Sequence, residues 1–379
     1  MTFACRSAAT IVLVVIAAAC QSSVSSSTKP SPALGSTLSP TAGPSAVRAS
    51  APSLSLPGTI AFARGEFPAP EHYFTIRPDG SGERDLFSIE GCSCLQLAPN
   101  GQTIWAQSET EWGTLAFATM EAGDKDRTVV VPSPKTLSLA TGPHASTPDG
   151  SLVAFWGWDD TNRKAAGLYL AAPDLGGLRQ VIGLPKGSEW ITPYGITPDG
   201  AKVLFFVERG RVGGVTHTGD LFLVDATGKN LRKLNPDGSV VAEVGGRLAS
   251  LSPDGRRVAF AAVANTEAMN HGGLFLVAAN GGAAEQVAEA DIGVFSAIWS
   301  PRGERILFGN EVIDTDGSNS RDLSGAGEIG SIIWSPDGKH LVVARGPPGS
   351  RDVWIMDLDG NLVSQVTHDP GTYTVWDWR

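Results

Sequence analysis

A four-residue turn sequence recurs six times along this chain of 379 residues and constrains its fold more than any other feature. Each copy has Ser, Thr or Ala, then Pro, then Asp, Asn or Arg, then Gly, and an apolar segment follows. The copies are Ala98–Gly101, Thr147–Gly150, Thr197–Gly200, Ser252–Gly255, Ser300–Gly303 and Ser335–Gly338. Their prolines lie 49, 50, 55, 48 and 35 residues apart. This spacing is typical of a β-propeller, in which each repeat forms one blade.

The role of this turn sequence is conformational. Proline fixes φ at the first corner of a tight turn, Asp or Asn tolerates the second corner, and glycine takes the positive φ that follows. Apolar segments flank the turn on both sides, as at 296–299 and 306–308 around Pro301. We therefore expect each copy to be a hairpin turn between two buried strands.

A second pattern lies between these turns: an apolar segment, a polar turn with glycine, and another strand. Its copies begin at or near Tyr73, Leu115, Leu168, Leu221, Leu274, Val312 and Val353. The first unit, from Gly58 to about Phe87, lacks an innermost strand, whereas the C-terminal segment Thr374–Trp378 is a spare one. If the spare strand completes the first unit, residues 58–379 form an all-β propeller of seven four-stranded blades, closed by that strand. Six blades are the alternative.

The repeats resemble the PD40, or TolB-like, propeller repeats, whose typical sequence is Trp-Ser-Pro-Asp-Gly followed by an Ile-Ala-Phe strand. Trp334–Gly338 matches it in full, Trp299–Gly303 differs only at Arg302, and Ser252–Phe260 matches from the serine onward. The resemblance covers essentially all of residues 58–379 and implies an extracytoplasmic propeller similar to protein-interaction scaffolds. The N-terminal domain usual in TolB proteins is not visible in the sequence, so a TolB-type partner is not implied.

The N-terminus resembles a bacterial lipoprotein signal. The apolar run Ala8–Ala19 is too short to span a bilayer but suits a signal peptide of residues 1–19. Small residues precede Cys20, as in a lipobox, so Cys20 is the expected lipidation site; the alternative is an ordinary signal peptide with Cys20 unmodified. Residues 20–57 are then a disordered tether rich in Ser, Pro and Thr. We expect the protein at the cell membrane, lipid-anchored on the extracytoplasmic face.

The charge balance argues against two kinds of partner. Asp and Glu total 39 against 29 Lys and Arg, a net charge of −10. Nucleic acid and anionic membrane surfaces attract a concentrated positive field, so neither is expected to bind through charge. The expected partners are an envelope protein or peptide, with a glycan as a further candidate and the membrane reached through the lipid anchor. The chain is expected to be a monomer.

Binding residues are expected on the face opposite the Pro-Asp-Gly turns. The second-to-third loops and the blade connections emerge there and vary in length, as between Val207 and Asp220, and variable loops on a rigid scaffold commonly carry binding sites. Their charged and aromatic residues are Glu71, His72, Glu109, Glu111, Trp112, Trp158, Asp159, Asp160, Arg163, Trp190, Glu208, Arg209, Arg211, His217, His271, Arg345 and Arg351. From these we select as candidate ligand-binding residues Trp112, Trp158, Asp159, Arg163, Trp190, Arg209, His217 and His271.

Several of these features also have a purely structural interpretation. Propeller tryptophans mostly pack between blades, and loop histidines are mostly solvated. His72, His217 and His271 lie on three loops of one face but lack the short spacing of a metal site, so neither a metal nor another cofactor is expected.

Two further patterns are not taken as metal sites. The segments Asp314–Gly317 and Asp357–Gly360 resemble the start of a calcium loop without its later glutamate, and we interpret both as hairpin turns. Cys92 and Cys94 form either a small strained disulfide or two buried thiols, since alternate residues of a strand point to opposite faces.

No catalytic residue is assigned, because the sequence holds no serine-hydrolase elbow, zinc-protease motif, Walker loop or dinucleotide fingerprint. The leading hypothesis is a non-catalytic, membrane-anchored, extracytoplasmic scaffold that binds a protein or peptide. The alternative is a carbohydrate-binding or carbohydrate-processing propeller, with Trp112 and Trp158 beside acids such as Glu111 and Asp159. A metal-dependent enzyme built on the three histidines is the third hypothesis.

Overall fold

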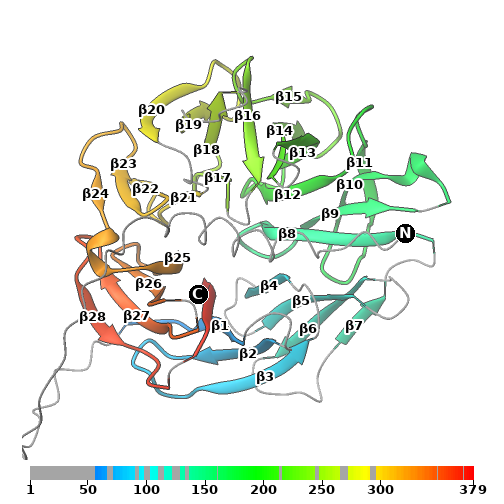
Figure 1. Ribbon diagram of the computed structural model, residues 1–379. Helices are drawn as coiled ribbons and strands as arrows, with labels where there is room; N and C mark the ends of the chain where they lie inside the picture. The colour runs from blue at the N-terminus through cyan, green and yellow to red at the C-terminus, as the bar shows by residue number, and fades with distance from the viewer. Residues whose placement is uncertain are drawn as a thin grey trace, which may run out of the picture.

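The computed structural model is an all-β molecule whose sheets stand around a common centre (Figure 1). The structure describes residues 56–65, 71–89, 94–97, 103–109, 115–121, 129–132, 136–159, 161–212, 216–243, 247–264, 272–290, 296–347, 349–369 and 371–379. Within these ranges the secondary structure consists of strands β1 to β29 and two short 3₁₀-helices, η2 (Arg163–Ala165) and η3 (Ser324–Ala326). The predicted all-β class is confirmed.

Five sheets have four strands each. In hydrogen-bonding order the first three are β29 (Tyr373–Trp378), β1 (Ile60–Arg64), β2 (Glu71–Ile76) and β3 (Arg84–Ile89); β4 (Cys94–Leu97), β5 (Thr103–Glu109), β6 (Leu115–Glu121) and β7 (Val129–Pro132); β8 (Ser138–Ser146), β9 (Val153–Trp158), β10 (Gly167–Ala171) and β11 (Arg179–Gly183). The other two are β21 (Ala297–Trp299), β22 (Arg305–Phe308), β23 (Glu311–Asp314) and β24 (Arg321–Asp322); β25 (Ile329–Trp334), β26 (His340–Arg345), β27 (Asp352–Asp357) and β28 (Leu362–Gln365).

The sixth sheet has nine strands and differs from the expected pattern of separate blades. It contains β12 (Ile191–Ile196), β13 (Lys202–Val212), β14 (Thr216–Asp225), β15 (Arg232–Lys233), β16 (Ser239–Glu243), β17 (Ala249–Leu251), β18 (Arg257–Ala264), β19 (Gly272–Ala278) and β20 (Glu285–Ala290). Strand β16 joins two sequence units because it pairs with β14 on one side and with β18 on the other.

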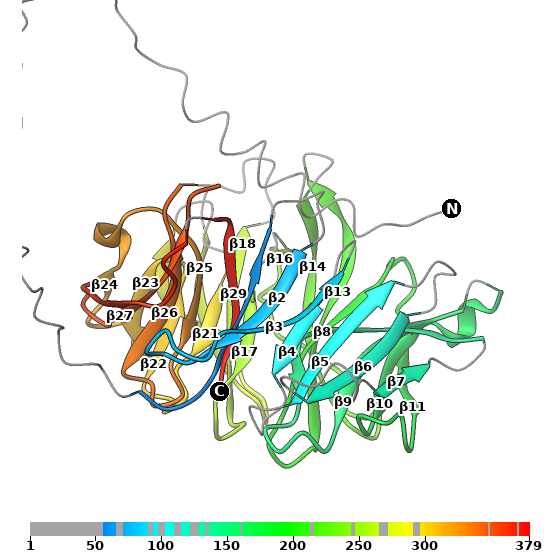
Figure 2. The same ribbon diagram turned by 90° about the horizontal axis from the view of Figure 1, so that it is seen from below.

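The C-terminal strand lies in the first sheet, next to β1. Strand β29 pairs with β1 in antiparallel register from Ile60↔Trp378 to Arg64↔Tyr373, and its end lies at one edge of the molecule (Figure 2). The rings of Phe62 and Tyr373 lie 5.6 Å apart, inside a buried apolar cluster that also contains side chains of β26 and β27. The first and last segments of the propeller sequence therefore share one sheet and one core.

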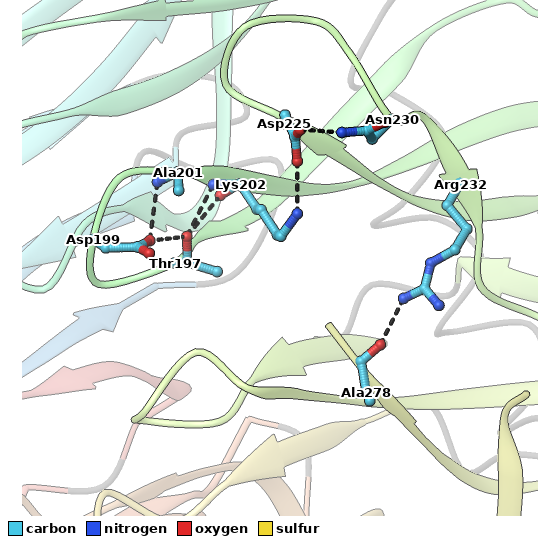
Figure 3. Close-up of polar contacts among 8 residues, drawn as sticks. All are labelled: Thr197, Asp199, Ala201, Lys202, Asp225, Asn230, Arg232 and Ala278. Atoms are coloured by element: carbon cyan, nitrogen blue, oxygen red, sulfur yellow. Dashed lines mark hydrogen bonds and ion pairs between the residues drawn. The ribbon is translucent and has the colours of Figure 1, made fainter. Parts of the chain in front are cut away.

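The repeated turns are held by side-chain hydrogen bonds, as Figure 3 shows for one copy. Thr197 Oγ1 donates to Asp199 Oδ1 over 2.6 Å and accepts from Lys202 N over 2.9 Å, and Asp199 also accepts from Ala201 N. The same bonds form in the copies that begin at Thr147, Ser252 and Ser335. Gly200 has a φ of +69°, a conformation that favours glycine. The predicted turn chemistry is confirmed in these copies.

Arginines of the outer strands link successive units, a feature that was not predicted from the sequence. Arg232 Nη2 on β15 donates to Ala278 O at the end of β19 over 2.6 Å (Figure 3). Arg179 on β11 donates in the same way to Ala226 O, and Arg321 on β24 pairs with Asp359 over 3.1 Å. Each bond runs from one unit's outer strand to the next unit's last turn, so neighbouring units are tied at their rims.

The segment from Val207 to Asp220, expected to be a loop, is mostly strand. Strand β13 continues to Val212, β14 begins at Thr216, and the two strands reach the upper edge of the molecule in Figure 2. The reason is long-range pairing: residues 217–219 of β14 find a second partner in β16. Polar residues that resemble a loop in the sequence thus form a three-stranded extension.

Candidate functional site

Three side chains from different elements meet beside the extension formed by β13, β14 and β16: Trp190, Glu208 and His217. Trp190 directly precedes β12, Glu208 lies on β13, and His217 lies on β14. His217 Nδ1 lies 2.7 Å from Glu208 Oε1, and the His217 and Trp190 rings lie 4.4 Å apart at 59°. We call these three residues the loop-face cluster. Two of its members, Trp190 and His217, were predicted as binding residues, and the structure brings them together.

Backbone pairing fixes the cluster's geometry. Glu208 N donates to Trp190 O over 3.2 Å, which holds the tryptophan beside the end of β13. Gly219 faces Glu208 across the hairpin, and a Cβ there would lie 2.0 Å from Val207 O and 2.8 Å from the Phe206 ring. Only glycine fits at this position, so β14 approaches β13 closely beside His217.

Because Glu208 is buried, it needs a hydrogen-bond partner, and His217 is that partner. The Glu208 side chain is fully buried, whereas His217 is 13% exposed. The hydrogen bond between Nδ1 of His217 and Oε1 of Glu208 fixes the imidazole ring in one orientation. Burying a carboxylate without a partner is costly, and His217 supplies that partner. Nε2, the second ring nitrogen of His217, is not bonded to Glu208.

Arg209 occupies a β-bulge next to the cluster. The register between β13 and β14 shifts between Glu208 and Gly210, so Arg209 has no residue opposite it. A bulge re-aims the extra side chain, and that of Arg209 is 41% exposed. Its Nε lies 3.3 Å from Asp220 Oδ2, and Lys233 Nζ lies 3.6 Å from Asp220 Oδ1. Arg209 is therefore a partly exposed cation, one residue along β13 from Glu208 and paired with Asp220.

The other described candidates, Trp158, Asp159 and Arg163, belong to the preceding unit. The Trp158 ring stacks on Trp156 with centroids 6.1 Å apart. Asp159 Oδ1 accepts from the side chain and backbone of Thr161, and these bonds lower the pKa of Asp159. Arg163 lies exposed on η2. Asp159 thus holds the loop that leads into η2, whereas Trp158 and Arg163 remain available to solvent.

Several predicted residues cannot be placed. Trp112, His271, Cys20 and Cys92 lie outside the described residues, so their roles stay predictions. His72 is exposed, and its ring lies 6.4 Å from that of Phe74. Within the described part of the chain no three His, Cys, Asp or Glu side chains gather as a metal site.

The two segments that resembled calcium loops are hairpin turns, as predicted. Asp314 accepts from Asn319 Nδ2 and ends β23, while Asp357 accepts from Asn361 and ends β27. The carboxylates of both residues are thus used within their own turns.

The contact between Glu208 and His217 was not predicted from the sequence. Glu208 was among the charged residues of the face but was not selected as a site residue. The sequence does carry one signal for this contact. Gly210 lies two residues after Glu208 and Gly219 two residues after His217, and a glycine within a strand marks a close approach of two backbones.

Comparisons with known proteins agree with this architecture. No family model matches the chain. An uncharacterized protein of Agrobacterium fabrum is 24% identical over 274 residues, which cover 65% of this chain and 82% of that protein. The structure of TolB from Acinetobacter baumannii matches with a TM-score of 0.50 at 17% identity, covering 83% of this chain and 65% of the TolB chain. The chain folds as a TolB-like β-propeller.

A second solved structure broadens the comparison. An oligogalacturonate lyase in complex with manganese matches with a TM-score of 0.59 at 12% identity, over 79% of this chain and 85% of that chain. At such identities the likeness concerns the fold alone. The TolB-like propeller is therefore a scaffold, and its activity has to be argued from its own residues. No helix among the described residues is long and apolar enough to cross a membrane.

Proposed function

We propose that this TolB-like propeller is an extracytoplasmic binding scaffold that recognises a protein or peptide through the loop-face cluster and Arg209. The observation that carries the proposal is the packing of Trp190 against His217 beside an exposed arginine on a bulge. Tryptophan and arginine are the residue types that most often dominate the free energy of protein–protein binding. Here Arg209 lies on strand β13, and Trp190 is held beside that strand by the hydrogen bond from Glu208 N to its backbone carbonyl, which lowers the entropy lost on binding.

In-cell chemical crosslinking with mass spectrometry tests this function. The full chain, a Trp190→Ala/Arg209→Ala variant and a matched Arg256→Ala variant would be compared. Arg256 is exposed on one of the Pro-Asp-Gly turns, so its variant removes a surface charge from the other face. We expect a protein partner with the full chain and with Arg256→Ala, and its loss with the double variant. A partner that the double variant retains in full, or the capture of no protein at all, would contradict the proposal.

The lipid anchor belongs to the same proposal. We infer that Cys20 is acylated and that residues 21–57 let the propeller stand off the membrane, which supports a scaffold that meets envelope proteins. A Cys20→Ser variant should leave the membrane fraction and lose labelling by a fatty-acid analogue. If Cys20→Ser stays in the membrane fraction with labelling unchanged, the anchor is elsewhere.

We also infer that the ring has seven blades. The nine-stranded sheet contains two complete four-stranded units, β12 to β15 and β17 to β20, with β16 as a strap between them. These two units and the five separate four-stranded sheets support a count of seven blades, in a ring closed by β29. An Ala63→Cys/Thr374→Cys variant tests closure, because these residues face each other across β1 and β29. A cross-linked peptide pair is expected under oxidising conditions, and two free thiols would contradict closure.

A carbohydrate ligand is the second candidate function. It is favoured by the half-buried Trp156 and Trp158, whose indole rings stack on each other, since an indole face suits a sugar ring. A glycan array with the full chain and a Trp158→Ala variant discriminates the two functions. Glycan binding that depends on Trp158 would favour this candidate, and a blank array would remove it.

A further inference from the structure

Arg247 is a half-buried cation that the loop-face cluster does not use. It lies two residues before β17, the innermost strand of its unit, and its backbone carbonyl accepts from Ala297 N of β21 over 2.8 Å. Ser250 Oγ, three residues later, donates to Ala297 O and accepts from Trp299 N. The backbone of this segment is thus fixed between two inner strands, so the position of Arg247 is well determined.

The guanidinium of Arg247 interacts electrostatically with residues of a strand that is not its neighbour in the inner ring. It lies within electrostatic range of Asp377 and Arg379, both at the end of β29. Strand β17 contacts β12 and β21, whereas β29 contacts β25 and β4, so the two strands are not neighbours in the inner ring. A side chain that reaches from one to the other must lie on the central side, where propellers have their channel.

One donor of the Arg247 guanidinium is not used by the described protein around it. Its Nη2 is inaccessible to solvent and has no hydrogen-bond partner in the structure as far as it is described. Asp377 is occupied elsewhere: its Oδ1 accepts from Trp378 N over 3.0 Å and its Oδ2 pairs with Arg379 Nε over 3.3 Å. A buried guanidinium donor without an acceptor is costly, and a bound acceptor would remove that cost.

The charges around Arg247 also favour a bound anion. Burial lowers the pKa of Arg247 to about 9, with Asp377 acting against this change and Arg379 adding to it. The side chain is therefore still charged at neutral pH. Asp377, the acid that acts on Arg247, is already paired with Arg379, so an anion bound at Arg247 would add a stabilising negative charge.

We propose that the centre of the propeller holds an oxyanion site at Arg247, which takes a carboxylate or phosphate group of a ligand. A planar guanidinium matches two oxygens of such a group at once. A second buried donor on the same inner ring, Trp376 Nε1, also lacks a hydrogen-bond partner among the described residues. The site is separate from the loop-face cluster and does not depend on its function.

Isothermal titration of the full chain with sodium phosphate and, in a second arm, sodium succinate tests the site. The variants are Arg247→Met and, as the matched control, Arg256→Met, which removes an exposed arginine. Saturable binding of at least one probe is expected for the full chain and for Arg256→Met. Loss of a charge-assisted hydrogen bond predicts binding about tenfold to hundredfold weaker for Arg247→Met. The probe that binds identifies the ligand group as carboxylate or phosphate.

Two results would overturn the proposal: no saturable binding of either probe to the full chain, or equal affinity of Arg247→Met. If Arg247→Met does not fold, Arg247→Lys carries the test, because lysine keeps the charge but lacks the planar fork. Its affinity is then expected to fall by about tenfold. An unchanged affinity of Arg247→Lys would count against the site. Because the probes are small ions, neither outcome changes the crosslinking test of the loop-face cluster.

Discussion

The two faces of the propeller use polar side chains in opposite ways. On the turn face, one set of bonds recurs from unit to unit: a Ser or Thr hydroxyl donates to an Asp two residues later and accepts from a backbone N–H. On the other face, Trp190, Glu208 and His217 form an arrangement built on a bulge and a close approach of two strands. The repeated polar groups all maintain the fold, whereas the unrepeated arrangement combines a buried pair that holds it in place with side chains that a ligand can reach.

The largest expected effect is on the free energy of unfolding, when Glu208 is replaced. Glu208→Ala leaves His217 without its buried partner, and breaking a buried pair of this kind lowers the free energy of unfolding by about 3 kcal/mol or more. Urea denaturation measures the change. Glu208→Gln keeps a carbonyl oxygen that can accept from His217 and should lose much less. Equal stability of Glu208→Ala and the native chain would mean that the pair does not hold the cluster.

A smaller effect, and one confined to binding, is expected for the exposed part of the site. Removing an interface tryptophan costs about 2 kcal/mol or more of binding free energy, so Trp190→Ala should bind the crosslinked partner about thirtyfold more weakly. Arg209→Ala should change the unfolding free energy by less than about 0.5 kcal/mol, because exposed ion pairs contribute little. Surface plasmon resonance and urea denaturation separate the two quantities. A large loss of stability in Arg209→Ala would break the comparison.

The turn face should show the reverse behaviour. Thr197→Ala removes the hydroxyl that bonds Asp199 and Lys202 N, at a cost of about 1–2 kcal/mol in the free energy of unfolding. Thr197→Ser keeps the hydroxyl and serves as the control. Partner binding should be unchanged in both variants, as measured on the folded proteins. Loss of binding in Thr197→Ala at full stability would assign a function to the turn face.

The smallest effect expected for a single residue is the change of the protein's stability with pH. Hydrogen bonds from Thr147 and Ser151 lower the pKa of Asp149 to about 2, and similar bonds lower the pKa of Asp199 and of Asp254. A folded-state pKa below the unfolded value of about 3.9 means that the stabilisation is present above pH 4 and is lost as pH falls towards 2. Thermal unfolding from pH 5 to pH 2 should show this loss, and Asp149→Asn should reduce its slope. An identical slope in the variant would show that this turn does not contribute.

The same division explains what could be predicted from the sequence. The turn face was predictable because its bonds are local: Thr197, Asp199 and Lys202 lie within six positions of one another. The pairing of β29 with β1 was also foreseen, because an unpaired apolar segment at the C-terminus matched a missing strand in the first unit. In both cases the signal lay in repetition, which a single sequence displays.

The candidate site was only partly predictable, for a physical reason. Trp190 and His217 were chosen by residue type, but their contact depends on the pairing of β12 with β13 and of β13 with β14, which joins residues almost thirty positions apart. Polar residues at 207–220 resembled a loop because strands that gain their partners at long range carry little local signal. Arg247 was missed for the same reason, since burial at the centre of a ring is a property of the assembled units.

Site-specific photo-crosslinking in cells tests the central claim most directly. A photoreactive amino acid would replace Glu189, which is exposed beside Trp190, and in a second strain Lys339, which is exposed on a turn of the other face. If the loop face is the binding face, the probe at 189 forms a discrete protein adduct and the probe at 339 does not. Adducts from 339 alone, or equal adducts from both positions, would contradict the assignment of function to the loop-face cluster.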